Sequence, residues 1–148
     1  MFAKMEQAAR ALVSGSASDP VVVVKALVNS VPMHVVADTG AARSLCNKED
    51  ALLLTLEQDP DVPNKQFTGL GDLPGAAARP VLLVLPKASA HVQFYIVDKP
   101  KMPLILGKHD LSGMQLLVDT VDNTLIYKET FEVVALGIDS PEGTSVGQ

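Results

Sequence analysis

Two neighbouring valine-rich runs place the strongest constraint on the fold of this chain. Val21–Val28 and Met33–Ala37 are rich in β-branched residues, and the stretch from Asn29 to Pro32 between them has the composition of a turn. This pattern predicts a β-hairpin. Its second strand runs directly into Asp38, so an acidic side chain closes a hydrophobic strand.

Shorter apolar segments follow along the chain, separated by stretches that contain glycine and proline. We expect strands at 78–85, 91–97, 104–106, 115–119, 124–127 and 131–136, and a short helix at 108–113. Asn47 is placed to cap another short helix, which we expect to continue through Leu56, because its side-chain oxygen can accept a hydrogen bond from a first-turn amide. Many short strands without a visible repeat predict an all-β domain, built as a barrel or a sandwich.

The length of 148 residues fits one folded domain. Residues 1–19 combine a segment of helical composition with a stretch rich in serine and glycine, and we expect them to form an N-terminal extension or linker. We expect the folded domain to span 20–136 and a flexible tail to span 137–148.

The composition argues against several classes of function. A net charge of -5, 4% aromatic residues and the absence of a Lys/Arg cluster predict no nucleic-acid partner. The longest apolar runs are far shorter than the ~20 residues of a membrane-spanning helix, so we expect no membrane partner. The three histidines are far apart, and we expect neither a metal site nor a cofactor. One cysteine and no secretion signal favour an intracellular protein.

The run Asp38-Thr39-Gly40 is the candidate catalytic motif. A carboxylate at the end of an apolar strand is costly to desolvate unless it is hydrogen-bonded or shares a proton. Two adjacent carboxyls can hold one proton between them, so that one activates a water and the other donates a hydrogen bond to a substrate carbonyl. Gly40 permits close backbone approach, so its amide can reach the carboxylate. Taken alone, the triplet also fits an ordinary turn after a strand.

A second segment gives this motif its context. Leu104-Ile105-Leu106-Gly107 places three aliphatic residues and a glycine before a short helix. Together with Asp38-Thr39-Gly40-Ala41 and Ser44, it resembles the retropepsin-like aspartic proteases of retroviruses and gypsy-type LTR retrotransposons, in which the second segment packs beside the active-site loop. The resemblance extends from about Val21 to Tyr127. It implies an all-β, retropepsin-like β-barrel, closed or partly open, with one or two short helices.

The resemblance also implies roles for individual residues. Asp38, Thr39 and Gly40 would be catalytic, and the glycine-containing stretch Phe67–Gly75 would be the flap that closes over a bound peptide. The expected substrate-binding residues are Ala41, Ala42, Gly69, Leu70, Gly71 and Leu106. Gly69-Leu70-Gly71 also matches the start of a nucleotide-binding loop, but Pro74 stands where that motif needs a third glycine.

The chain carries one Asp-Thr/Ser-Gly motif, so a mechanism with two carboxylates requires a homodimer. The resemblance therefore implies an aspartic endopeptidase of a retroelement, with a peptide or polyprotein substrate, in the cytoplasm or a virus-like particle. Two alternatives remain open. One is a domesticated, non-catalytic domain for dimerisation or peptide binding, and the other is a cellular retropepsin-like protease of the DNA-damage-inducible type.

Several positions after the two motifs differ from the retroviral pattern. Ala42 stands where many members carry an acidic residue, whereas Lys108 keeps the basic position that would pair with it. The brace between subunits that such a pair makes must be replaced or absent. For Arg43 we favour a solvated surface charge over a contact in the substrate groove. Cys46 is expected to be a small buried hydrophobe and not a nucleophile.

Overall fold

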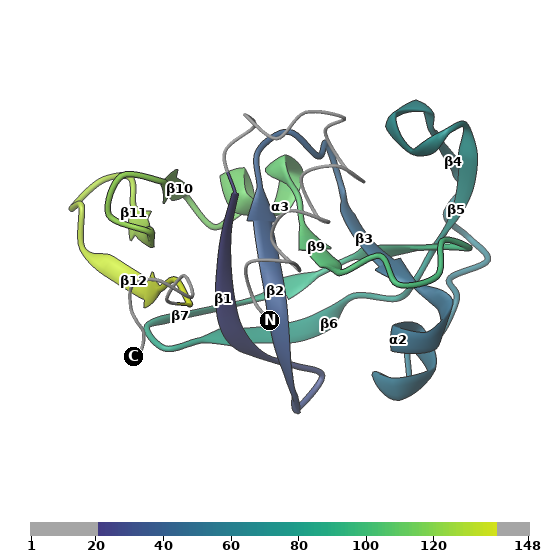
Figure 1. Ribbon diagram of the computed structural model, residues 1–148. Coiled ribbons are helices and arrows are strands. Elements are labelled where there is room, and N and C mark those ends of the chain that lie inside the picture. Colours follow the sequence, from purple (N-terminus) through teal and green to yellow (C-terminus); the bar gives the residue numbers. More distant parts are fainter. Residues whose placement is uncertain (1–20, 139–148) are drawn as a thin grey trace.

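The structure is a computed structural model and describes residues 21–138. It is mostly β with two short α-helices in this range, as the sequence predicts. The elements are β1 (Val21–Val28), β2 (Val31–Asp38), β3 (Ser44–Asn47), α2 (Lys48–Leu53), β4 (Lys65–Phe67), a 3-10 turn (Thr68–Leu70), β5 (Leu73–Ala77), β6 (Val81–Leu85), β7 (Ala88–Val92), β8 (Phe94–Val97), β9 (Leu104–Leu106), α3 (Lys108–Gly113), β10 (Leu116–Asp119), β11 (Thr124–Tyr127) and β12 (Val133–Leu136) (Figure 1). The expectations for 1–19 and for 139–148 lie outside the described residues.

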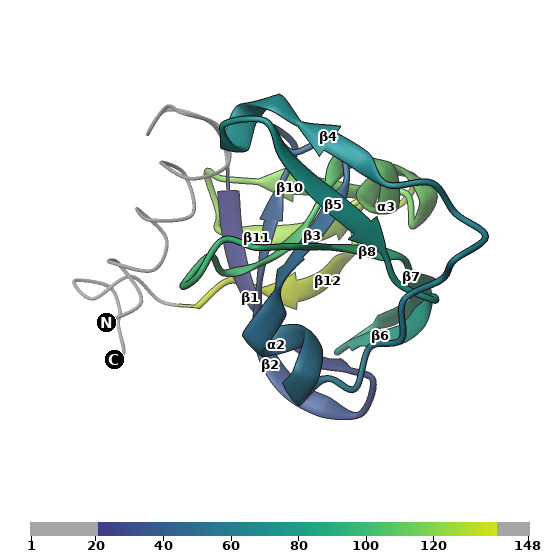
Figure 2. The same cartoon turned by 90° about the vertical axis from the view of Figure 1, so that its right-hand side faces the viewer.

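Nine of these strands form one open sheet in the order β4-β5-β8-β3-β9-β2-β1-β6-β7. The other three, β10, β11 and β12, form a separate antiparallel sheet. In Figure 1 the hairpin β1–β2 stands in the middle, with the small sheet on one side and β4, β5 and α2 on the other. Figure 2 views the molecule from the side that carries β4 and β5.

The predicted hairpin is present, but its turn is shorter than expected. Val28 pairs with Val31, so the turn consists of Asn29 and Ser30 alone, and both have positive φ angles (49° and 70°), as tight hairpin turns require. Pro32 therefore lies inside β2. It is tolerated because β9 pairs with β2 at Val35–Ala37, further along the strand, so the missing amide of Pro32 breaks no ladder on that side.

The strand β9 lies between the two strands that flank Asp38 in sequence. It runs parallel to β2, with Val36 opposite Ile105, and antiparallel to β3, with Leu45 opposite Ile105. The chain leaves β2, makes a loop over residues 39–43 and returns as β3 on the far side of β9. The second sequence motif is thus inserted between the two ends of the Asp38 loop.

The hydrophobic core has two parts, one on each face of the strands next to the site. Along β1, Val22 and Val24 join one buried cluster, whereas Val21 and Val23 join the other. β2 and β9 alternate in the same way, which explains why these three segments are continuous apolar runs instead of alternating with polar residues. The backbone around Asp38 is therefore held on both faces.

Several boundaries differ from the sequence-based expectation. β3 was not predicted, and α2 ends at Leu53 instead of Leu56, because the chain turns at Thr55, which has a φ of 56°. The strands expected at 78–85 and 91–97 are three strands, since Pro86 and Lys87 form a tight turn between β6 and β7. The last strand begins at Val133, not at residue 131.

The described chain continues past residue 136, where we expected the folded domain to end. The Gly137 amide donates to the Asn123 carbonyl at 2.7 Å, and the Ile138 amide donates to the Val23 carbonyl at 2.7 Å. The first bond closes the small sheet onto the β10–β11 turn, and the second ties the end of that sheet to β1. Within residues 21–138 no helix is long and apolar enough to cross a membrane.

Candidate active site

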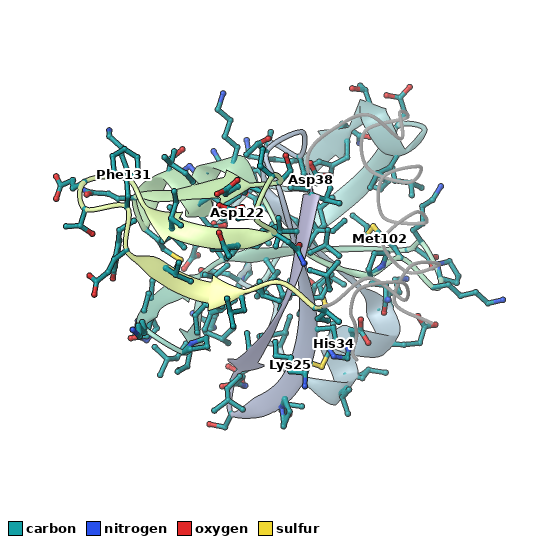
Figure 3. All side chains as sticks on the ribbon, turned by 60° about the vertical axis from the view of Figure 1, so that its left-hand side comes forward. Lys25, His34, Asp38, Met102, Asp122 and Phe131 are labelled. Carbon is teal, nitrogen blue, oxygen red and sulfur yellow. The ribbon has the colours of Figure 1, made fainter. Side chains whose placement is uncertain are left out.

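Asp38 is the last residue of β2 and is fully buried. The Gly40 amide donates to its Oδ1 at 2.7 Å, which is the backbone contact expected from a glycine two residues after the acid. The Ala41 amide donates to the Asp38 carbonyl at 3.2 Å and closes the turn. Thr39 and Gly40 are exposed at the tip of the loop. Figure 3 shows Asp38 at the opposite end of the β1–β2 hairpin from Lys25 and His34.

The start of α3 fixes the rest of this loop. The Lys108 amide donates to the Ala41 carbonyl at 2.7 Å, and the His109 amide donates to the Ala42 carbonyl at 3.1 Å. Gly107 comes so close that a Cβ there would lie 2.3 Å from the Arg43 carbonyl oxygen. The contact between the loop and the 107–109 segment is thus made by backbone groups, at the place where the retroviral pattern has an acid–base pair.

Ser44 joins the two motifs through its side chain. Its hydroxyl accepts a hydrogen bond from the Gly107 amide at 3.0 Å and donates to Oδ2 of Asp110 at 2.5 Å. Ser44 is fully buried. Burial raises the pKa of the Asp110 carboxyl, although the Ser44 hydrogen bond and the charges of His109 and Arg43 act in the opposite direction.

The expected flap is a hairpin of β4 and β5 whose tip spans residues 68–72. The Gly71 amide donates to the Thr68 carbonyl at 3.1 Å, and Gly71 has a φ of 83°, a backbone conformation that favours glycine. Leu70 is buried in the cluster that also contains Ala41 and Ile105, so the tip is anchored over the loop after Asp38. At the base, Gly75 leaves room for the Phe67 ring, which packs edge-on against Tyr95 at 5.6 Å between centroids.

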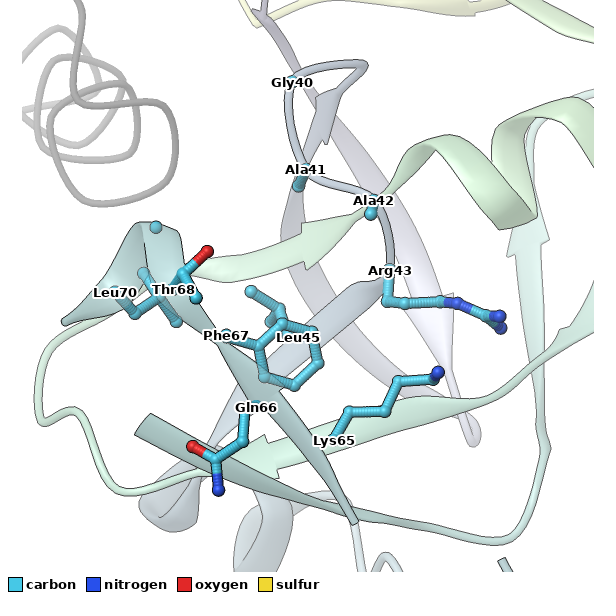
Figure 4. A pocket seen from close by; sticks show the side chains of 11 residues that line it. Gly40, Ala41, Ala42, Arg43, Leu45, Lys65, Gln66, Phe67, Thr68 and Leu70 are labelled. Atoms are coloured by element: carbon cyan, nitrogen blue, oxygen red, sulfur yellow. The ribbon is translucent and has the colours of Figure 1, made fainter. Parts of the chain in front are cut away.

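A pocket of about 540 Å³ lies between the Asp38 loop and this hairpin (Figure 4). The loop after the catalytic motif forms one wall, and the strand and tip of the flap form the other. The lining residues are Gly40, Ala41, Ala42, Arg43, Leu45, Lys65, Gln66, Phe67, Thr68, Gly69 and Leu70. The volume lies in the range of small-ligand pockets, and the lining combines apolar side chains with polar and charged ones.

Most of the residues expected to bind substrate line this pocket. Ala41, Ala42, Gly69 and Leu70 are in its wall, whereas Gly71 is not, and Leu106 is fully buried in the core opposite Ala37. Asp38 lies two residues from the lining residue Gly40 and does not line the pocket itself.

Part of the pocket wall was not expected from the sequence. Arg43 lines the pocket, although we favoured a solvated surface charge there. Leu45, Lys65 and Gln66 were also not expected in the wall, whereas Phe67 and Thr68 belong to the stretch expected as the flap. The aromatic Phe67 next to the glycine-containing tip was the available signal for that stretch. Strand β4 could not be located, because Lys65 and Gln66 have no apolar pattern.

Within the described residues, neither Cys46 nor a cluster of metal-binding side chains provides a second reactive site. Cys46 is fully buried, and burial raises the pKa of its thiol to about 12, which keeps it protonated and unreactive. No group of three or more His, Cys, Asp or Glu side chains among residues 21–138 is arranged to hold a metal ion.

The chain has the retropepsin-like fold. It is similar to the retroviral protease-like domain of Ddi1 from Leishmania major, with a TM-score of 0.58 and 22% identity over 79% of this chain and 94% of that one. It also aligns with the EIAV protease in complex with the inhibitor HBY-793, with a TM-score of 0.46 and 20% identity over 65% of this chain and 88% of that one. The family models and the curated protein sequences contain no match to it.

Proposed function

We propose that this protein is an aspartic endopeptidase that acts as a homodimer. The observation that supports the proposal best is the construction of the Asp38 loop. Its carboxylate accepts a hydrogen bond from the Gly40 amide, and the loop is held by β9 and α3 beside a pocket whose opposite wall is the flap. A fully buried carboxyl group costs stability, and a position of this kind therefore favours a functional role over a purely structural one.

In the proposed mechanism each of two chains contributes one Asp38. The two carboxyls share one proton, because like charges so close together cannot both ionise. The ionised carboxylate takes a proton from a water as it attacks the scissile carbonyl, and the protonated partner donates a hydrogen bond to the carbonyl oxygen. The Gly40 amide holds Oδ1 and so fixes the orientation of the carboxyl.

Dimerisation has a consequence for access to the site. Asp38 is fully buried in the single chain, so association must rearrange its surroundings to admit a shared water. Because each active site would need two chains, we expect the specific activity to rise with protein concentration until all chains are dimeric. The backbone bonds from Lys108 and His109 hold the loop within each chain, and they do not replace the brace between subunits that Ala42 cannot form.

Two protein substrates fit the proposal. The sequence pattern favours the polyprotein of a retroelement. The likeness to the Ddi1 domain, which extends over 94% of that chain, supports the second candidate, in which the protein is a cellular retropepsin-like protease and its substrates are cellular proteins. A precursor polyprotein and a set of unrelated cellular proteins, incubated in parallel, distinguish the two.

The test compares cleavage by the unaltered protein and by Asp38→Asn at mildly acid pH, with and without a statine-type inhibitor. Asp122→Asn is the matched control, because it makes the same chemical change in an exposed turn between β10 and β11. We expect cleavage by the unaltered protein and by Asp122→Asn, and none by Asp38→Asn or in the presence of the inhibitor. Equal cleavage by all variants, or by none, would refute the proposal and favour the non-catalytic alternative.

The oligomeric state is tested separately by sedimentation over a range of concentrations. A mass that remains at 15.6 kDa while Asp38-dependent cleavage is observed would refute the homodimer. Activity that is independent of protein concentration, at concentrations where the mass changes, would refute the shared site.

A further inference from the structure

The pocket between the Asp38 loop and the flap has a charge opposite to that of the whole chain. Two of its lining residues are cationic, Arg43 from the loop and Lys65 from β4, and none of the described residues that line it is acidic. Figure 4 shows both side chains extending toward the same end of the pocket, from its two walls. Because the chain has a net charge of -5, this local charge is not a consequence of composition.

Neither cation is engaged in an ion pair within the described part of the chain. The ion pairs there join Lys48 to Asp98 and Arg79 to Glu57. The charge of Arg43 acts on the pKa of Asp110. However, the Asp110 carboxylate accepts a hydrogen bond from the Ser44 hydroxyl and forms no ion pair with Arg43. His109, the other titratable group beside Asp110, adds no negative charge.

The two cations differ in how firmly they are held. Arg43 is half-buried and follows Ala42, whose carbonyl is fixed by the His109 amide. Its guanidinium can bind a carboxylate through two parallel hydrogen bonds. Lys65 is exposed on the outermost strand of the sheet and carries its charge on a flexible stem. Around them, Leu45, Phe67 and Leu70 provide the apolar part of the wall.

We propose that Arg43 and Lys65 select peptide substrates that carry an acidic side chain, Asp or Glu, next to an apolar residue near the scissile bond. This inference rests on the proposed protease function and names its substrate class. Arg43 makes the main contact with the carboxylate, and Lys65 closes over it from the flap. In a symmetric dimer each half of the groove carries one such cationic pair.

The test measures binding, so that it does not depend on turnover. The full chain with Asp38→Asn is titrated against fluorescent pools of short peptides in which one position at a time is fixed as Glu, Gln or Lys. We expect at least one position at which Glu binds roughly tenfold more tightly than Gln, the size of one charge-assisted hydrogen bond. Arg43→Gln, added to this chain, should remove most of the preference, and Lys65→Gln should reduce it.

Lys87→Gln is the matched control, because it removes the same charge from the exposed β6–β7 turn and should leave the preference unchanged. Urea unfolding midpoints equal to that of the parent show that the variants are folded. Equal binding of Glu and Gln at every position, a preference that persists in the double variant Arg43→Gln/Lys65→Gln, or no binding of any pool overturns the proposal.

Cleavage of the same pools by the unaltered chain separates this inference from the proposed function. Asp38-dependent cleavage without a Glu preference would support the proposed protease function but refute the selection of acidic substrates. Glu-dependent binding through Arg43 without Asp38-dependent cleavage refutes the protease and leaves a module that binds acidic peptides.

Discussion

Replacement of Gly107 by alanine is the sharpest test of how the two sequence motifs fit together. A Cβ at this position would lie 2.3 Å and 2.4 Å from the carbonyl oxygen and carbon of Arg43, and 2.9 Å from the carbonyl oxygen of Ala41. All three atoms belong to backbone. Because backbone cannot rotate away as a flexible side chain can, the loop and the start of α3 must separate.

The cost follows from the contacts that such a separation weakens. Forcing an extra carbon into a packed site costs about 1–3 kcal/mol, and each weakened hydrogen bond adds about 1 kcal/mol. Three hydrogen bonds depend on this approach: Gly107 to the Ser44 hydroxyl, Lys108 to Ala41 and His109 to Ala42. We expect Gly107→Ala to lower the free energy of unfolding by about 3–5 kcal/mol, a large part of the total stability of a small domain.

The measurement is urea unfolding at fixed protein concentration, followed by circular dichroism because the chain has no tryptophan. Gly113→Ala is the matched control, since a Cβ there meets nothing within 4 Å, and we expect it to be neutral or to stabilise the last turn of α3 by up to about 1 kcal/mol. A Gly107→Ala protein as stable as the parent, or a Gly113→Ala protein destabilised as strongly, would refute the argument.

Three further predictions concern the side chains around the loop. Ser44→Ala should lower the free energy of unfolding by about 2–3 kcal/mol in urea titrations, because it leaves the buried Gly107 amide without its acceptor; a loss below 0.5 kcal/mol would count against it. Burial raises the pKa of Asp110, so the folded state binds its proton more tightly than the unfolded state does. This carboxyl therefore stabilises the fold at pH values below its ordinary pKa of 3.8. The contribution is lost as the pH rises through the higher pKa of the folded state. Asp110→Asn, compared with the parent by unfolding at a series of pH values, should remove this decline, and identical pH profiles would contradict the assignment. Since the thiol of Cys46 has a pKa raised to about 12, a disulfide reagent at pH 8 should modify it only as the protein unfolds; rapid modification without urea would show that it is accessible.

Much of the site's framework was predictable, because local sequence and local structure agree there. The valine runs of β1 and β2, the apolar segment of β9 and the helix α3 at 108–113 are where the sequence places them. Asn47 caps α2 as expected, accepting the Asp50 amide at 2.7 Å. The Gly40 amide reaches Oδ1 of Asp38 as expected, because glycine has no side chain that would block the close backbone approach.

The elements that were missed owe their form to distant partners. β3 has no alternating pattern, because all four of its residues are buried and its two faces pack into different core clusters, Cys46 in one and Leu45 in the other. β7 has an Ala-Ser-Ala start with weak β propensity and forms by pairing with β6. The position of Arg43 in the pocket wall depends on β4, which approaches from a separate part of the chain.

The placement of β9 between β2 and β3 also determines when this loop can acquire its shape during synthesis. The Gly107 amide and the Ser44 hydroxyl that it contacts are 63 residues apart, so most of the domain must leave the ribosome before they can meet. Closing so long a segment is entropically unfavourable and slow compared with forming the β1–β2 hairpin. A nascent chain that ends before Leu104 therefore contains Asp38 without the strand that positions its loop. A chain still being translated would therefore carry the motif before its loop has the shape that the proposed activity needs.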